Sequence, residues 1–212
     1  MKVIIFDLWS TIAYHKYKDG SLGDICKECY KKDYRTFLKS YEDIFQTSKN
    51  VSFDKGFEKL FKKLKIKYDD KKIKKYTDKR RRYESAFIFY KYLFPLLKKL
   101  KNEGYKIALL SNTDAYLGEK IKKTKLNKYF DGFFFSYDLK SIKPNPKNFK
   151  AVLKYFKIKP SEALMIGDTF QDDVVPARKL GLKAIHFKRG DQILKELRKG
   201  EIIRWKRLKL KY

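Results

Sequence analysis

The chain has 212 residues, of which 43% are hydrophobic and 17% aromatic, and its formal net charge is +28. This length and apolar content predict one sizeable core with a small accessory unit, and they exclude intrinsic disorder. No apolar run is long enough to span a membrane, and the N-terminus lacks the basic, apolar and small-residue order of a signal peptide. We therefore expect a soluble, cytoplasmic protein that has no membrane partner.

The positive charge comes from 53 Lys and Arg residues against 25 Asp and Glu residues, and it is spread along the chain. Diffuse lysine with few cysteines and methionines is typical of a heat-adapted surface. We expect weak, nonspecific binding of polyanions from such a charge. A second hypothesis is a nucleic-acid-binding surface, with the densest basic runs at residues 71–82 and 204–211.

Few side chains in the sequence suit a zinc or redox site. The two cysteines, Cys26 and Cys29, form a single CKEC pair, and the two histidines are His15 and His186. No second cysteine pair completes a four-ligand zinc site. We interpret the cysteines as small structural residues.

Five short apolar segments predict β-strands, at residues 3–6, 107–110, 133–135, 163–166 and 184–187. Helical segments lie between the later strands: residues 95–103 end at Gly104, Asp114 caps the next helix, Pro146 opens another, and residues 172–180 end at Gly181. Alternating strands and helices predict an α/β fold, a Rossmann-like parallel sheet with helices on both faces. Ligands of such sheets bind beyond the carboxyl ends of the strands.

Residues 11 to about 92 interrupt this alternation. Apolar residues recur at helical spacing in residues 30–45 and 53–64, and a longer helix is predicted over residues 70–92. We expect an all-helical insertion placed over the end of the first strand. The predicted division is a core domain of residues 1–13 plus 93–212 and a helical cap domain of residues 14–92.

Polar side chains follow the predicted strands at the points where these end. Their carboxyl ends meet at one edge of a parallel sheet, so the side chains should cluster there. Acids gathered around one lysine suit a divalent cation with oxygen ligands, and a carboxylate nucleophile permits phosphoryl transfer. The residues concerned are Asp7, Thr11, Ser111, Asn112, Lys143, Asp168, Asp172 and Asp173.

In order and spacing, these clusters resemble the haloacid dehalogenase (HAD) superfamily. The family pattern is DxDxT, then a hydrophobic residue with Ser or Thr, then Lys, then GDxxxxD; here the matching segments are FDLWST, ALLSNTD, SIKPNPKNF and GDTFQDD. The resemblance covers nearly the whole chain, and it implies a HAD-like hydrolase in which the insertion is the family's helical cap.

The resemblance also implies a role for each of these residues. Asp7 is the nucleophile and a ligand of Mg²⁺, which Asp168 also binds. Thr11 and Ser111 hold the transferring group, Asn112 contributes to substrate binding, and Lys143 neutralises charge. Asp173 has the commoner family spacing from Asp168, and Asp172 is the alternative second acid. The substrate would be a small phosphorylated or otherwise anionic molecule.

Trp9 departs from the family pattern. Family phosphatases carry at this position a second Asp, which protonates the leaving oxygen and later activates water. The Trp9 side chain cannot transfer a proton, although its backbone carbonyl can still bind the metal, as it does in the family. His15 is a possible replacement donor, but we interpret it as a solvent-facing residue at the start of the cap, and His186 as a satisfied core or surface residue.

Three functions follow from this substitution. The favoured one is a Mg²⁺-dependent phosphatase restricted to good leaving groups, such as acyl or aryl phosphates. The second is a 2-haloacid dehalogenase, since that branch of the family carries an aromatic residue at the position of Trp9, and Arg35 could match the arginine of its cap. Against this function, the dehalogenase branch has Ser and Asn in place of Asp168 and Phe170, and Tyr in place of Phe149. The third is a catalytically impaired polyanion-binding protein, whose arm would be the tail at residues 201–212; an added edge strand is the alternative for that tail.

Overall fold

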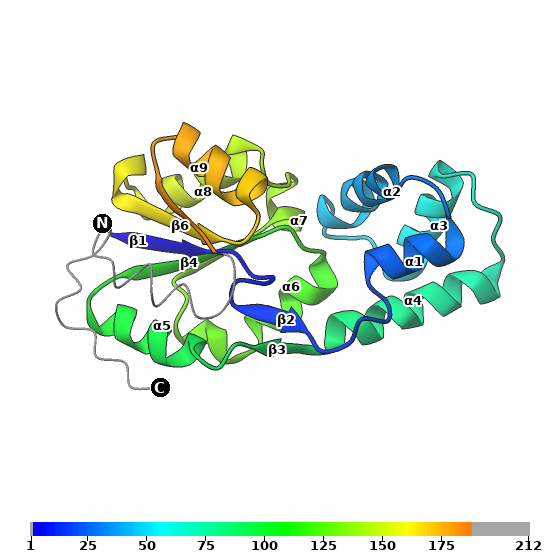
Figure 1. The fold of residues 1–212 in the computed structure, drawn as a ribbon, viewed down its shortest axis with the longest axis horizontal. Coiled ribbons are helices and arrows are strands. Elements are labelled where there is room, and N and C mark those ends of the chain that lie inside the picture. Colours follow the sequence, from blue (N-terminus) through cyan, green and yellow to red (C-terminus); the bar gives the residue numbers. More distant parts are fainter. Residues whose placement is uncertain (1, 188–212) are drawn as a thin grey trace.

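The computed structural model describes residues 2–187, and its centre is a five-stranded sheet in the order β5-β4-β1-β6-β7. All four neighbouring pairs are parallel. This confirms the predicted α/β parallel sheet (Figure 1). The predicted tail structure at residues 201–212 lies outside the described residues. The strands are β1 (Val3–Phe6), β4 (Lys106–Ser111), β5 (Gly132–Phe135), β6 (Ala163–Gly167) and β7 (Lys183–His186).

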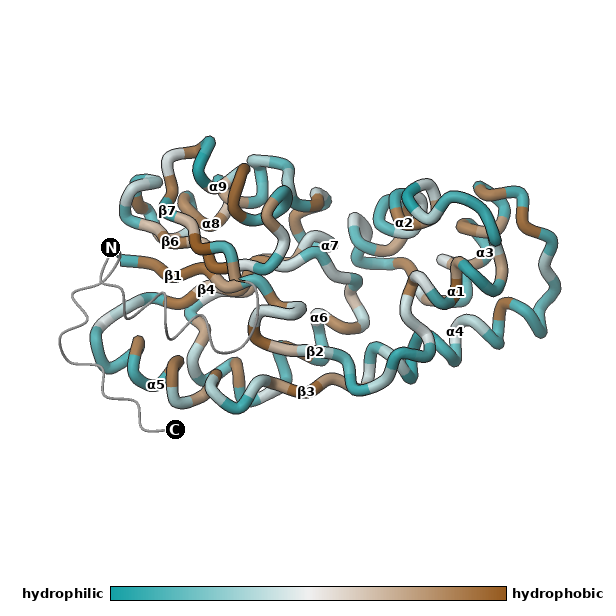
Figure 2. The backbone as a smooth tube through the Cα atoms, in the orientation of Figure 1, coloured by the Kyte–Doolittle hydropathy of each residue, from teal (hydrophilic) through white to brown (hydrophobic). Residues whose placement is uncertain are grey.

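Helices cover both faces of the sheet because alternate strand residues point to opposite sides. In β1, Ile4 and Phe6 join a cluster with α5 (Leu93–Asn102) and α6 (Ala115–Lys122). Val3 and Ile5 join the opposite cluster, with α8 (Pro146–Phe156) and α9 (Val175–Lys179). Figure 2 shows the apolar strands between more polar outer surfaces. Shorter elements are α7 (Ser136–Leu139), η2 (Lys125–Lys128), η3 (Pro160–Glu162) and the π-helical η4 (Phe170–Val174).

The segment between β1 and β4 carries a hydrophobic core of its own, made of residues between Ile25 and Tyr76. Aromatic side chains dominate it, with Phe57 and Phe61 fully buried. In Figure 1 this helical group lies beside the sheet, to its right. Its helices are α1 (Leu22–Cys29), α2 (Tyr34–Tyr41), the π-helical η1 (Glu42–Gln46), α3 (Phe53–Lys63) and α4 (Asp70–Ser85).

The prediction of one helix over residues 70–92, and hence of an all-helical insertion, is wrong. Helix α4 ends at Ser85, and β3 (Phe87–Phe89) pairs antiparallel with β2 (Ala13–His15). Aromatic and β-branched residues favour strands, and this pairing satisfies their backbone groups. A two-stranded ribbon therefore connects the insertion to the core (Figure 1). The domain limits at residues 13 and 93 remain a prediction.

None of the helices within residues 2–187 is both long enough and apolar enough to cross a bilayer.

Candidate active site

Strand β1 ends by placing Asp7 in a buried position at the carboxyl edge of the sheet. The Asp7 amide donates to the Ile166 carbonyl of β6 at 2.9 Å, and Asp7 is 6% exposed. The following loop is tight, because the amides of Ile12 and Ala13 both donate to the Leu8 carbonyl at 2.9 Å. This loop brings Thr11 back beneath the strand end, where it is fully buried.

Lys143 joins two of the acids. Its Nζ donates to Asp7 Oδ1 at 2.6 Å and to Asp173 Oδ1 at 2.5 Å, and the lysine is 4% exposed. Asn112 holds the Lys143 backbone: its Oδ1 accepts from the Lys143 amide at 2.7 Å, and its Nδ2 donates to the Lys143 carbonyl at 3.1 Å. Asn112, predicted to bind substrate, thus positions Lys143 in this structure.

Of the two alternative second acids, Asp173 lies in the cluster. Carboxylate oxygens of Asp7, Asp168 and Asp173 all lie within 4.8 Å of one another, whereas Asp172 is half-buried beside them. The Asp173 carboxylate also accepts from the Thr169 amide at 3.1 Å. Gly167 makes this approach possible, because a Cβ there would lie 2.2 Å from Asp173 Oδ2.

The cluster is electrostatically strained without a further cation. Burial raises the pKa of Asp7 to about 7 despite the attraction of Lys143, and the charge of Asp173 raises it further. Burial and Asp173 also raise the pKa of Asp168. Burial opposes the charge of Lys143, yet Asp7 and Asp173 together raise its pKa. Three acids around one lysine form an oxygen-donor set that fits Mg²⁺.

Two hydroxyls at the site have no partner within residues 2–187. Thr11 Oγ1 and Ser111 Oγ are buried without a hydrogen bond, and the two residues are 0% and 1% exposed. Buried hydroxyls are normally hydrogen-bonded, so a pair of free ones at the end of a sheet indicates a place for an external acceptor. The oxygens of a phosphoryl group would serve.

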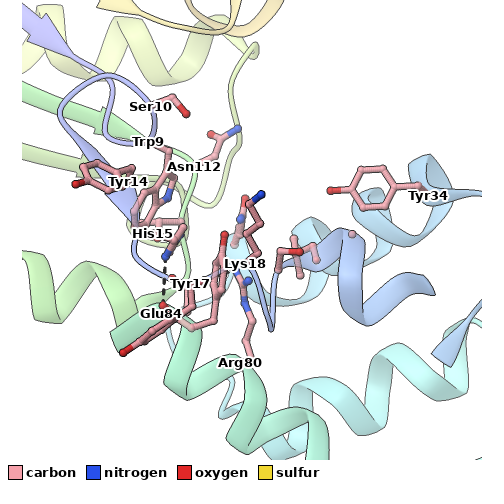
Figure 3. Close-up of a pocket in the computed structure, with 16 residues that line it drawn as sticks. Trp9, Ser10, Tyr14, His15, Tyr17, Lys18, Tyr34, Arg80, Glu84 and Asn112 are labelled. Atoms are coloured by element: carbon pink, nitrogen blue, oxygen red, sulfur yellow. Dashed lines mark hydrogen bonds and ion pairs between the residues drawn. The ribbon is translucent and has the colours of Figure 1, made fainter. Parts of the chain in front are cut away.

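Trp9 belongs to an aromatic stack that links the site to the insertion. Its ring stacks on His15 at 3.8 Å between centroids (Figure 3). His15 in turn stacks on Tyr83 of α4 at the same distance. The prediction that His15 faces solvent is wrong: the ring lies half-buried in this stack, and its Nδ1 donates to the Tyr83 carbonyl at 3.2 Å. Burial and the charge of Arg80 lower the pKa of His15 to about 3. His15 is therefore neutral at pH 7 and is not a cationic acid there.

Two residues near the acids were given no role in the site from the sequence. His186 Nε2 donates to the Asp168 carbonyl at 2.9 Å, so it holds the backbone of a predicted metal ligand. Gly167 was not singled out either. The sequence does contain a signal for it, since glycine directly precedes Asp168 in the motif GDTFQDD.

A cavity of about 790 Å³ adjoins this site. Trp9 and Asn112 line it from the strand ends, and Tyr34 and Arg80 line it from the insertion (Figure 3). Tyr83 of the insertion lines it as well.

Comparison with known proteins identifies the family. A model described as haloacid dehalogenase-like hydrolase matches residues 1–181. The chain belongs to this family. A glyceraldehyde 3-phosphate phosphatase from Pyrococcus furiosus is 28% identical over 90% of this chain and 82% of its own length. These findings confirm the predicted family and a hydrolase of the HAD type.

Solved structures of HAD enzymes share the fold. A HAD family enzyme from Bacteroides thetaiotaomicron, in a magnesium complex, aligns with a TM-score of 0.70 at 23% identity, over 93% of this chain and 98% of that one. A HAD phosphatase from Thermococcus onnurineus aligns with a TM-score of 0.60 at 23% identity, over 96% and 100% of the two chains.

The neutral His15 predicts a pH dependence of stability. In the unfolded chain, the His15 ring binds a proton below about pH 6.5, whereas in the native protein it does so only below about pH 3. The free energy of unfolding should therefore fall as the pH decreases from 6.5, by about 2 kcal/mol at pH 4.5 after allowance for the ring's partial exposure. His15→Phe keeps a flat ring in the stack without the titration. We expect urea unfolding to show this variant gaining about 2 kcal/mol on the wild type between pH 7 and 4.5; an equal difference at both pH values would contradict the assignment.

Proposed function

We propose that this protein is a Mg²⁺-dependent phosphatase that uses Asp7 as its nucleophile and acts on phosphates with good leaving groups. One observation carries the proposal: Lys143 bridges the buried Asp7 and Asp173, and Asp168 lies within 4.8 Å of both acids. The unpartnered hydroxyls of Thr11 and Ser111 complete a site that can receive a phosphoryl group.

The reaction proceeds in two displacements on Asp7. A carboxylate oxygen of Asp7 attacks phosphorus, the bond from phosphorus to the leaving oxygen breaks, and the leaving group departs with the electron pair. Water then attacks the aspartyl-phosphate and releases inorganic phosphate. Thr11 and Ser111 donate to the phosphoryl oxygens, and the Lys143 ammonium neutralises their negative charge.

Magnesium would be held by Asp7, Asp168 and the Trp9 carbonyl, with Asp173 beside it. When bound, it offsets the charge of the acids and of the phosphoryl group. A magnesium complex is named for the Bacteroides thetaiotaomicron structure, which supports this assignment. The 2-haloacid dehalogenase alternative gives no role to Asp168, because a second acid beside the nucleophile repels it when no metal is present.

We expect hydrolysis of acetyl phosphate to require Mg²⁺. EDTA should abolish the activity and added Mg²⁺ should restore it, because the acids then ionise together without mutual repulsion. Asp168→Asn should raise the Mg²⁺ concentration for half-maximal rate by about 10-fold or more, since a lost ligand charge weakens a hard-cation site. Phosphate release with acetyl phosphate, p-nitrophenyl phosphate and glyceraldehyde 3-phosphate measures this. Undiminished hydrolysis in EDTA, or halide release from 2-chloropropionate, would overturn the proposal.

A further inference from the structure

The cavity beside the candidate active site lies where the leaving group of a bound phosphate would extend. Trp9 and Ser10 line it two and three residues beyond Asp7, and Asn112 and Thr113 line it directly after Ser111. The opposite wall comes from the insertion, where Tyr34 stands across the cavity with its hydroxyl directed toward the Trp9 side (Figure 3). A group attached to a phosphate held by Thr11 and Ser111 would enter this space.

Aromatic side chains gather at this cavity. Tyr14, Tyr17 and Tyr34 line it and are 39%, 47% and 43% exposed, which makes them three of the seven exposed large hydrophobic residues within residues 2–187. Single exposed hydrophobic residues are ordinary on protein surfaces, but a group around one cavity indicates a ligand. The stacked rings of Trp9, His15 and Tyr83 form a further wall. Polar side chains such as Ser10, Lys18 and Gln46 line the rest of the cavity, and the aromatic part of the lining suits a planar, apolar ring.

At this cavity the usual second acid is replaced by Trp9, whose side chain cannot protonate a leaving group. Among the described residues that line it, His15 is neutral at pH 7 and already donates to the Tyr83 carbonyl. The carboxylate of Glu84 is paired with the guanidinium of Arg80, which also donates to the Tyr41 hydroxyl at 3.1 Å. Because no acid stands at position 9, we expect the leaving oxygen to depart as an anion.

We propose that the cavity binds the aromatic ring of an aryl phosphate, a monoester in which the ring is bonded directly to the ester oxygen. This assignment rests on the proposed phosphatase function. As Asp7 attacks phosphorus, the bond from phosphorus to the aryl oxygen breaks and its electron pair stays on a phenolate, which needs no proton in that step. Phenols have a pKa near 10, whereas alcohols are far weaker acids. The aromatic ring therefore stabilises the leaving anion, so that the anion can depart without a general acid.

The test compares 1-naphthyl phosphate with acetyl phosphate, a good leaving group that has no ring. In Tyr34→Ala and in Tyr17→Ala, the ratio of kcat/KM for 1-naphthyl phosphate to that for acetyl phosphate should fall about fivefold, as expected for a lost ring contact. Tyr155→Ala is the matched control: Tyr155 is exposed on α8, away from the cavity-lining residues, and its loss should leave the ratio unchanged.

Binding of 1-naphthol, measured by calorimetry in the same variants, separates the two proposals. Hydrolysis of neither substrate would refute the phosphatase function; weaker naphthol binding in Tyr34→Ala than in Tyr155→Ala would still support the aromatic site. A different result would overturn the aromatic site and leave the phosphatase function standing. In that case both substrates are hydrolysed, and Tyr34→Ala and Tyr17→Ala change neither the kcat/KM ratio nor the binding of 1-naphthol.

Discussion

Asp7→Asn is expected to lower kcat for acetyl phosphate by at least about 10³-fold, because an amide oxygen is too weak a nucleophile to form the aspartyl-phosphate. The substitution keeps the size of the side chain and its place beside Lys143. Phosphate release should fall to background, and the acid-stable phosphoenzyme that the wild type forms from labelled acetyl phosphate should be absent. Asp70→Asn, an exposed acid on α4, is the control.

The same variant should not be less stable at alkaline pH. The native pKa of Asp7 is raised from 3.8 to about 7, so the native protein holds a proton more tightly than the unfolded chain. Stability from this group is present below pH 3.8 and is lost as the pH rises through about 7. Without Mg²⁺ at pH 8, the wild type carries this penalty and Asp7→Asn does not. An inactive variant that is also less stable would indicate a structural role instead, and retention of a tenth of the activity would exclude Asp7 as the nucleophile.

The strand-end residues could be predicted from sequence because the physics that places them is local and general. A buried apolar run identifies each strand, and a parallel sheet brings all the strand ends to one edge. Asp7, Ser111 and Asp168 each directly follow or end such a run. The proximity of these three residues could therefore be predicted without knowing how distant parts of the chain pack.

The surroundings of Trp9 could not be predicted in this way. His15 contacts Tyr83 across 68 positions of sequence, and the ribbon of β2 and β3 joins segments that are 72 to 76 positions apart. Helical periodicity over residues 70–92 carries no information about such a partner, so it predicts a helix that continues through Phe87, where the structure has a strand. Burial of the ring and the nearby charge of Arg80 make His15 neutral, and both follow from this long-range packing, which the sequence did not indicate.

Trp9→Asp is expected to raise kcat for alkyl phosphates by about 10²-fold, at the low end of the range for a positioned general acid. Acetyl phosphate should gain little, because its leaving group is already stable as an anion. A plot of rate against leaving-group pKa, measured with alkyl, aryl and acyl phosphates, should therefore flatten in the variant. Loss of the stack on His15 and of the edge contact with Phe87 should lower the free energy of unfolding by about 2 kcal/mol, since Trp9 is only half-buried.

Trp9→Asn isolates the proton transfer from these packing losses. Asparagine has the shape of aspartate and removes the same ring, but it cannot protonate a leaving oxygen, so this variant should show the stability loss without the gain on alkyl phosphates. An equal gain in both variants would mean that removing the ring merely opened the cavity. If the wild type already hydrolyses glyceraldehyde 3-phosphate as fast as acetyl phosphate, another acid acts. Glu84 is then the residue to replace first, because burial raises its pKa to about 8 and it lines the cavity. His15 is neutral above its pKa of about 3, and its N–H already donates to the Tyr83 carbonyl.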